Sequence, residues 1–368
     1  MSNIPGVFAN PTQCRCYAAM ESSGKIVPHV ITRRSCGPAD IVIDIKFAGI
    51  CHSDIHMVRN EWMEGEFPLV PGHEIGGLVT AIGEQVKNFA VGDVVGVGCI
   101  VDSCRVCSEC MNGNEQYCLN GLVGTYGGKF KYPHCAEYNT EGGNRTNGGY
   151  SKTIVVDRSY VCKIPTNLDL AAATPLLCAG ITTYSPMKHF GLQSGHRFAV
   201  NGLGGLGHMG AKFGKAFGCH TTVISRGSRK KESALTGLGA DAFLDSTDAE
   251  AMKAATGTFD FILDTVSAEH SMDALLSLLK VDGKVVLVGA PPKGFQVSHP
   301  FNVIARRLTV AASMIGGMRE TQEMLDFCGQ HGITCDVEVV KPTEIDECYN
   351  RAVAGDVKYR FVIDTADI

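Results

Sequence analysis

Two residue types that bind zinc lie near each other in the first part of the chain. Cys51 stands in the run ICHSDIH and His73 in PGHE, and thiolate sulfur and imidazole nitrogen are ligands that Zn²⁺ prefers. Cys178, in the run PLLCAG, is the candidate third ligand if folding brings it back to this pair. Cys162 is the rival, but it falls within a strand pattern. Three protein ligands with one open position would make a catalytic zinc site.

A second group of cysteines has the spacing C-x2-C-x2-C-x7-C. Its members are Cys104, Cys107, Cys110 and Cys118. The surrounding residues 101–122 contain few apolar side chains, so metal binding would have to hold this lobe in shape. Four closely spaced thiolates predict a closed, tetrahedral structural zinc site. The alternatives are four unrelated thiols or a nucleic-acid-binding ribbon, although Arg105 is the only basic residue in the segment.

The composition is that of a globular protein long enough for two domains, with 368 residues, 45% of them hydrophobic and 19% charged. A formal net charge of -5 and a pI of about 6.2 argue against nucleic acid or anionic lipid as partners. No apolar segment is long enough to span a membrane, and the N-terminus has no secretory signal pattern. We therefore expect a cytoplasmic protein whose 16 cysteines bind metal or remain free thiols.

The order of patterns along the chain predicts two domains. Short β-rich runs separated by Gly and Asp occupy residues 41–101, and the polar, Gly-rich stretch 122–150 is typical of a surface loop. From residue 196 to 315 strands alternate with helical segments, which predicts a doubly wound parallel sheet. We expect a catalytic domain of residues 1–178 and 317–368, with the metal lobe at about 101–122, and an inserted dinucleotide-binding domain of residues 179–316.

A glycine-rich turn follows the first strand of the second domain. It reads Gly202, Leu203, Gly204, Gly205, Leu206 and Gly207. In such a turn Gly202 permits the tight bend, Gly204 lets the backbone approach a pyrophosphate, and Gly207 lets helix and strand pack closely. The N-terminus of the following helix also favours an anion. A strand before the turn and a helix after it make this a specific signal for dinucleotide binding.

The end of the next strand indicates which dinucleotide binds. NAD sites carry an acidic residue about 20 residues after the turn, but this chain has none between Gly207 and Glu232. It has instead the basic run SRGSRKK, in which Ser225, Arg226 and Lys230 are candidates to bind a 2′-phosphate. We therefore predict NADP(H) as the cofactor. The alternative is that these charges only begin a solvated helix.

Taken together, these motifs resemble the zinc-dependent medium-chain dehydrogenases, and within them the NADP-dependent branch similar to cinnamyl alcohol dehydrogenase. The resemblance covers nearly the whole chain and includes CHSDIH, PGHE, the spaced cysteines, NGGYS, PLLCAGITTY, GLGGLG, ISRGSRKK, LGAD and YRFVID. It implies a GroES-like catalytic domain with an inserted doubly wound Rossmann domain, a fold of class α/β plus β. It also implies two zinc ions per chain and a homodimer formed through the nucleotide domains.

The resemblance further implies roles for individual residues near the first cysteine. Glu74 would lie beside the catalytic zinc, either as a transient ligand or as a neighbour of the ligands. Ser53 keeps the hydroxyl that many relatives have as Thr, so a proton could pass from it, through the nicotinamide ribose, to His56 and water. The alternative for His56 is an ordinary surface histidine. Asp54 would orient a neighbouring group, and His52 would contact cofactor phosphate or solvent.

Four further side chains are candidates for lining a substrate pocket: Trp62, Cys99, Val123 and Met314. Val123 stands where lignin-forming relatives have Trp, and Met314 where they have Phe. The resemblance implies a small-molecule aldehyde or alcohol as substrate, of aromatic or medium size. Because these two positions differ from those of lignin-forming relatives, cinnamyl compounds are only one candidate class. The alternative functions are reduction of a C=C bond by the same fold and a non-catalytic NADPH-binding redox sensor.

Overall fold

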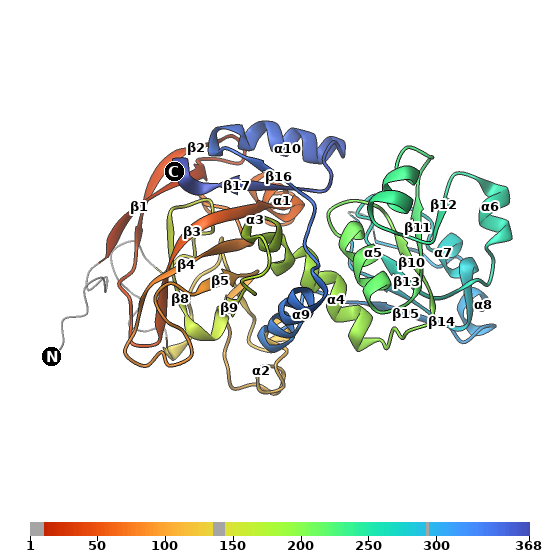
Figure 1. Cartoon of the computed structure of the whole chain (residues 1–368), viewed down its shortest axis with the longest axis horizontal. Helices are drawn as coiled ribbons and strands as arrows, with labels where there is room; N and C mark the ends of the chain where they lie inside the picture. The colour runs from red at the N-terminus through yellow and green to blue at the C-terminus, as the bar shows by residue number, and fades with distance from the viewer. Residues whose placement is uncertain (1–10, 135–143, 292–293) are drawn as a thin grey trace. The chain divides into compact units, whose positions relative to one another are not determined.

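The computed structural model describes residues 11–134, 144–291 and 294–368 (Figure 1). The chain divides into two compact units. Unit 1 consists of Met1–Cys178 and Gly316–Ile368, and unit 2 consists of Ala179–Ile315. No helix within the described residues is long and apolar enough to cross a membrane.

The main sheet of unit 1 is built from both ends of the chain. Its strands lie in the order β16-β17-β3-β4-β5-β9, and β8 pairs with β3 outside this path. Their bounds are Val337–Val340 (β16), Arg360–Asp364 (β17), Asp40–Ile50 (β3), Ile75–Ile82 (β4), Val94–Val97 (β5), Cys162–Lys163 (β9) and Thr153–Asp157 (β8). β17 runs antiparallel to β3, with Phe361 opposite Ile50, and Figure 1 shows the two side by side. The C-terminal segment therefore completes a sheet that the first strands begin.

Smaller elements complete unit 1. They are the hairpin β1 (Thr12–Ala19) and β2 (Ile26–Arg33), the pair β6 (Ile100–Asp102) and β7 (Val123–Gly124), and the helices α1 (His52–Val58), α2 (Ser108–Met111), α3 (Leu170–Ala173), α9 (Met318–His331) and α10 (Ile345–Ala354). One hydrophobic cluster joins the hairpin, α1, α10 and β17 through Ala18, Ile55, Tyr349 and Phe361. Because α1 packs into this cluster, the residue that precedes it, Cys51, is buried.

The stretch 122–150 is not simply a surface loop. Of its described residues, Tyr126, Thr146 and Tyr150 are buried, and the Tyr349 hydroxyl donates a hydrogen bond to the Tyr150 hydroxyl at 3.4 Å. Residues 135–143 of this prediction lie outside the described residues. The prediction was wrong for both ends of the stretch, because large aromatic side chains anchor them in the core despite the polar composition between them.

Unit 2 contains the predicted doubly wound parallel sheet. Its six strands lie in the order β12-β11-β10-β13-β14-β15 and are all parallel. Their bounds are Ala242–Asp245 (β12), His220–Ser225 (β11), Arg197–Asn201 (β10), Phe259–Asp264 (β13), Leu279–Leu287 (β14) and Thr309–Ala312 (β15). β10 and β13 are adjacent although two strands separate them in the chain order, so the winding reverses direction between them.

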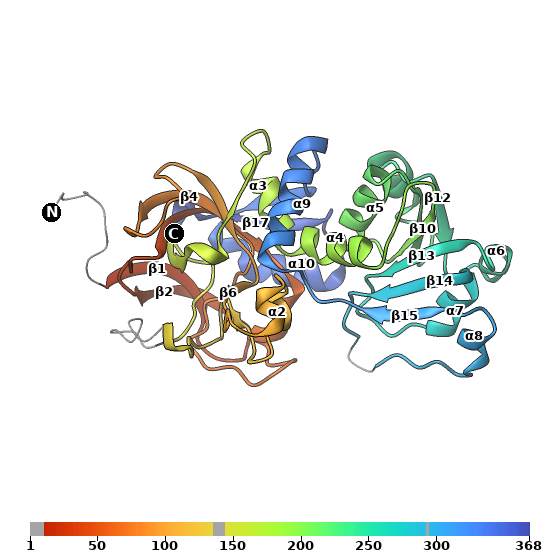
Figure 2. The ribbon, with the colours of Figure 1, turned by 90° about the horizontal axis from the view of Figure 1, so that it is seen from below.

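Helices cover both faces of this sheet (Figure 2). Successive residues of a strand point to opposite faces. Phe198 and Val200 of β10 therefore lie against α5 (Gly207–Ala216), which itself packs on α4 (Ala179–His189). Ala199, between them, belongs to a cluster with α6 (Ala249–Ala254), α7 (Met272–Leu278) and α8 (Phe301–Ile304). Each face thus has an apolar layer of its own.

β10 ends in a turn that requires glycine. Gly202 has a φ of 92°, in the left-handed region that side chains disfavour. A Cβ at position 207 would lie 2.0 Å from the carbonyl oxygen of Gly202, whereas a Cβ on Gly204 would meet no protein atom within 4 Å. α5 begins at Gly207, and the backbone N–H of His208 in its first turn donates to the carbonyl oxygen of Gly204 at 3.0 Å, so the N-terminus of this helix lies beside the open space next to Gly204.

Alanine substitutions at Gly207 and Gly204 should differ in their effect on the stability of unit 2. Gly207→Ala should lower the free energy of unfolding of unit 2 by about 2 kcal/mol or more, because the new methyl group collides with backbone. Gly204→Ala should change it by less than about 0.5 kcal/mol, because the methyl group enters empty space. Thermal and denaturant unfolding of both variants measures the difference, and equal losses would contradict the packing argument.

Candidate metal centres and dinucleotide site

Unit 1 brings the first candidate ligand set together in its interior. One ligand atom from each of Cys51, His73, Glu74 and Cys178 lies within 4.8 Å of the others, and all four residues are buried. Cys51 is the cap of α1, His73 and Glu74 immediately precede β4, and Cys178 follows the 3-10 turn Thr174–Leu177. Two thiols, one imidazole and one carboxyl within this spacing are a donor set that fits Zn²⁺. Cys162 is not part of the group, and burial raises the pKa of its thiol to about 12.

Asp54 hydrogen-bonds to both chain segments that carry the ligands Cys51 and His73. Its Oδ2 accepts the backbone N–H of Cys51 at 2.9 Å, and its Oδ1 accepts that of Gly72 at 3.1 Å. The same Oδ1 lies 3.2 Å from Nδ1 of His73. A proton on Nδ1 therefore donates to Asp54, which leaves Nε2 as the nitrogen free to bind a metal. Asp54 is fully buried, and the Tyr150 hydroxyl also donates to it at 3.3 Å.

Arg360 of β17 forms an ion pair with Glu74, the carboxyl member of the ligand set. The Arg360 guanidinium donates to Oε1 of Glu74, while Oε2 is buried without a hydrogen-bond partner. A Cβ on Gly49 would lie 1.9 Å from that Oε2, so a larger residue there would displace the carboxyl group. Burial raises the pKa of Glu74 to about 7, although the positive charge of Arg360 opposes this shift. An unpartnered buried carboxyl oxygen next to two thiols fits a nearby cation.

The candidate proton-transfer residues lie on α1. The Cys51 thiol donates to Oγ of Ser53 at 3.6 Å, so this hydroxyl adjoins the ligand set. Nδ1 of His56, one helical turn after Ser53, is hydrogen-bonded to the carboxylate of Glu61. The Trp62 ring stacks on the His56 ring, with 4.8 Å between centroids. The imidazole of His56 is therefore oriented by two neighbours and is only about a quarter exposed. His52 precedes Ser53 and is exposed.

The four candidate pocket residues have different surroundings. The Cys99 thiol hydrogen-bonds with that of Cys178, which places it against the ligand set. Trp62 is half exposed, and Val123 is buried in β7. Met314 is exposed and belongs to unit 2. Cys99 is thus the one of these four that the structure of unit 1 places in contact with a candidate ligand.

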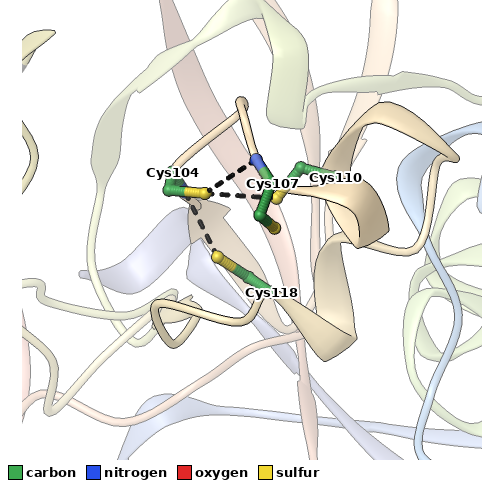
Figure 3. Close-up of side chains that lie close together, drawn as sticks. All are labelled: Cys104, Cys107, Cys110 and Cys118. Carbon is green, nitrogen blue, oxygen red and sulfur yellow. Dashed lines mark hydrogen bonds between the residues drawn. The ribbon is translucent and has the colours of Figure 1, made fainter.

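The four closely spaced cysteines form a compact group around α2 (Figure 3). Their sulfur atoms lie within 4.8 Å of one another. Backbone N–H groups donate to three of them: Cys104 to Cys118 at 3.4 Å, Cys107 to Cys104 at 3.4 Å, and Leu119 to Cys107 at 3.5 Å. Such N–H···S bonds stabilise thiolates, and the set therefore fits a four-coordinate structural zinc.

A hydroxyl pair connects this lobe to the rest of unit 1. Oγ of Ser103 lies 3.1 Å from Sγ of Cys110 and 2.8 Å from the hydroxyl of Tyr160. The guanidinium of Arg105 bonds Asp102 at 2.8 Å and Asp157 at 2.9 Å. These contacts attach the lobe to β6 and to the end of β8, so its position does not depend on an apolar core of its own.

One member of the basic run in unit 2, Lys230, lies against the glycine turn. Nζ of Lys230 donates to the carbonyl oxygen of Leu203 at 2.5 Å. Burial and the positive charges of Arg229 and Arg226 lower the pKa of Lys230. Ser225 is the last residue of β11, the strand that pairs with β10. A group of cations next to a glycine turn with open space above Gly204 fits a phosphorylated dinucleotide.

Sequence reasoning missed Arg360 as a partner of the ligand set. The signal was present, since an arginine in the apolar strand run YRFVIDT must have a buried partner or a special role. The partner itself was not visible, because Glu74 and Arg360 are far apart in the chain and meet only when β17 joins β3. Tyr150 was also missed as a support of Asp54, because the two residues are 96 positions apart in the chain and meet only in the folded unit.

Comparisons with known proteins agree with both units. Residues 37–166 match the family model of the alcohol dehydrogenase GroES-like domain, and residues 205–330 match that of the zinc-binding dehydrogenases. A probable mannitol dehydrogenase of Medicago sativa is 50% identical over 358 residues, 97% of this chain and 96% of the relative. The NADP-dependent alcohol dehydrogenase C 1 of Mycolicibacterium smegmatis is 49% identical over 353 residues, 96% of this chain and 98% of the relative.

A solved structure is also closely similar. The cinnamyl alcohol dehydrogenase SbCAD4 from Sorghum bicolor superimposes with a TM-score of 0.91 at 46% identity, over 96% of this chain and 98% of that one. The GroES-like and Rossmann-type domains expected from the sequence are thereby confirmed. Because the matches extend over nearly the whole chain at about half identity, the protein belongs to the family of zinc-binding alcohol dehydrogenases.

Proposed function

We propose that this protein is a zinc-dependent alcohol dehydrogenase that transfers hydride between NADPH and a small-molecule aldehyde. The observation that carries the proposal is the buried group of Cys51, His73, Glu74 and Cys178, whose ligand atoms lie within 4.8 Å of one another. A redox sensor has no need of this mixed donor set. When bound, zinc polarises the carbonyl group and the nicotinamide supplies the hydride.

The chain's own residues hold the reacting groups. Cys51 and Cys178 would bind the metal as thiolates, and His73 would bind it through Nε2 while Asp54 fixes its ring. Glu74, with one oxygen occupied by Arg360, is available through the other. The four cysteines around α2 would hold a second zinc that stabilises their lobe without taking part in the reaction.

Proton transfer would use α1. Ser53 can hold a proton at Oγ beside the ligand set, and His56 can exchange one with solvent at Nε2 because Glu61 occupies its Nδ1. The alternative, that His56 is an unconstrained surface residue, is less favoured by its contacts with Glu61 and Trp62. Trp62, Cys99, Val123 and Met314 remain candidates for recognising an aldehyde of aromatic or medium size.

We further infer that the protein is a homodimer joined through unit 2. β15 is an edge strand of the parallel sheet in the described residues, paired only with β14. Phe301 and Ile304 of the preceding helix α8 are 63% and 64% exposed. An uncovered edge next to large apolar side chains favours pairing with a second copy. The free thiols of the described cysteines agree with a reducing, cytoplasmic location.

Metal analysis of a ligand variant tests the central proposal. The unaltered protein should contain about two zinc ions per chain and Cys51→Ser about one, with aldehyde reduction lowered more than about 100-fold, because the donor set is broken. NADPH should still bind to the variant, as measured by nicotinamide fluorescence. The matched control is Cys36→Ser, a half-buried thiol outside both ligand sets.

Other outcomes would point to the alternatives. One zinc per chain in the unaltered protein, with reduction of enones but not of saturated aldehydes, would support a C=C reductase of the same fold. NADPH binding without turnover of any aldehyde in a panel of aliphatic, benzylic and cinnamyl compounds would support the redox sensor. The same panel ranks the substrates if the proposal holds.

The choice between NADP and NAD depends on the basic run. Arg226→Ala should raise the Michaelis constant for NADPH roughly 10-fold or more, because a 2′-phosphate loses a charged partner, and should change that for NADH less than about threefold. Lys253→Ala, in α6, is the matched control for loss of one positive charge. Equal effects of Arg226→Ala on both cofactors would contradict the assignment.

The dimer proposal has a direct test. Phe301→Glu with Ile304→Glu should halve the mass measured by analytical ultracentrifugation, because a charged helix face cannot be buried without partners. Val91→Glu changes an equally exposed residue of unit 1 and should leave the mass unchanged. A double variant that keeps the mass of the unaltered protein would place the interface elsewhere.

A further inference from the structure

His270 is bonded at both ring nitrogens to groups that only accept hydrogen bonds. Its Nε2 lies 2.8 Å from Oδ2 of Asp264, and its Nδ1 lies 2.9 Å from the carbonyl oxygen of Ala268. A neutral imidazole carries one N–H and could satisfy one of these contacts, while its other nitrogen would face an oxygen lone pair. An imidazolium carries two N–H groups and satisfies both. This pair of acceptors therefore favours a protonated His270.

The segment that His270 closes packs directly against the glycine turn. Asp264 is the last residue of β13, and its Oδ1 accepts the side-chain amide of Asn201, the last residue of β10, at 2.9 Å. Oγ1 of Thr265 donates to the carbonyl oxygen of Asn201 at 2.8 Å. A Cβ on Gly202 would meet Val266 at 2.9 Å. The loop after β13 is thus one wall of the turn that would receive the pyrophosphate.

We propose that His270 is a positioning residue that, as an imidazolium, locks the loop 265–270 beside the glycine turn and makes the affinity for the dinucleotide fall as the pH rises. This inference rests on the proposed function, because it concerns how unit 2 binds NADPH. It assigns a role to a histidine that touches none of the catalytic residues.

The surroundings of His270 favour its charged form. Asp264 is almost completely buried and faces it from β13, and the hollow that His270 lines also carries the acidic side chains of Glu269 and Asp273. The hydrogen bond to Asp264 raises the pKa of His270 above its ordinary value, against a smaller effect of burial. A raised pKa means that the contact is complete below the ordinary range of histidine and is lost as the pH rises through the raised value.

Substitution of Asp264 by asparagine should reverse the pH dependence. The amide oxygen can still accept from Asn201, while the amide N–H₂ now faces Nε2 of His270 and requires an acceptor there. A neutral His270 with its proton on Nδ1 then satisfies both contacts, so the loop is locked at high pH and loosened at low pH. His270→Gln should remove the dependence, because a carboxamide does not titrate.

The experiment measures the dissociation constant of NADPH, by nicotinamide fluorescence, between about pH 6 and about pH 9. Over this pH range the dissociation constant of the unaltered protein should rise by a factor roughly 10 times larger than that of His270→Gln. In Asp264→Asn the part of the change that depends on His270 should have the opposite sign. NADH is titrated in parallel to subtract ionisation of the 2′-phosphate. His299→Gln, another histidine of unit 2, is the control and should follow the unaltered protein.

The outcomes are distinguishable. Parallel pH profiles for the unaltered protein and either variant would overturn the role of His270 while leaving NADPH binding intact. Absence of NADPH binding to the unaltered protein at every pH would overturn the proposed function and this inference together. Circular dichroism checks that each variant is folded, and if one variant is not, the profile of the other decides.

Discussion

The ligand set of unit 1 depends on one buried carboxylate. Asp54 accepts hydrogen bonds from the backbone at Cys51 and Gly72, and its Oδ1 faces His73. A carboxylate without water is stable only when its lone pairs are satisfied, so these donors and Asp54 fix one another. This arrangement explains why the start of α1 and the turn before β4 have one relative position. A ligand set that is positioned before the metal arrives loses less entropy when it binds.

A second buried charge ties the C-terminal segment to the same centre. Arg360 and Glu74 are both almost fully buried and form an ion pair. Removing one partner would leave the other charge unpaired in the interior, which typically costs about 3–5 kcal/mol. Because Arg360 belongs to β17, the antiparallel pairing of β17 with β3 and the geometry of the ligand set depend on each other. The C-terminal segment therefore both completes the main sheet of unit 1 and supplies the charged partner of Glu74.

The candidate dinucleotide site of unit 2 lies at the carboxyl ends of its parallel strands. The carboxyl ends of β10, β11 and β13 lie at one edge, and the glycine turn, the basic run and the loop after β13 follow them in that order. Ligands of open parallel sheets bind where the winding reverses, here between β10 and β13. Asn201 and Asp264, the last residues of these two strands, are hydrogen-bonded across that point. The loop that His270 closes is thus attached to the strand ends that define the site.

Local patterns in the sequence determined the strand-turn-helix around Gly202, the compact lobe of four cysteines and the alternation that builds the parallel sheet, because each depends on residues close together in the chain. They also indicated the family. The tertiary structure alone decided that Arg360 faces Glu74, that Tyr150 is buried in a stretch of polar composition, and that His270 bridges Asp264 and Ala268. A buried charge is stable only with its partner, and which distant side chain becomes that partner depends on strand pairing and packing, which no local pattern contains.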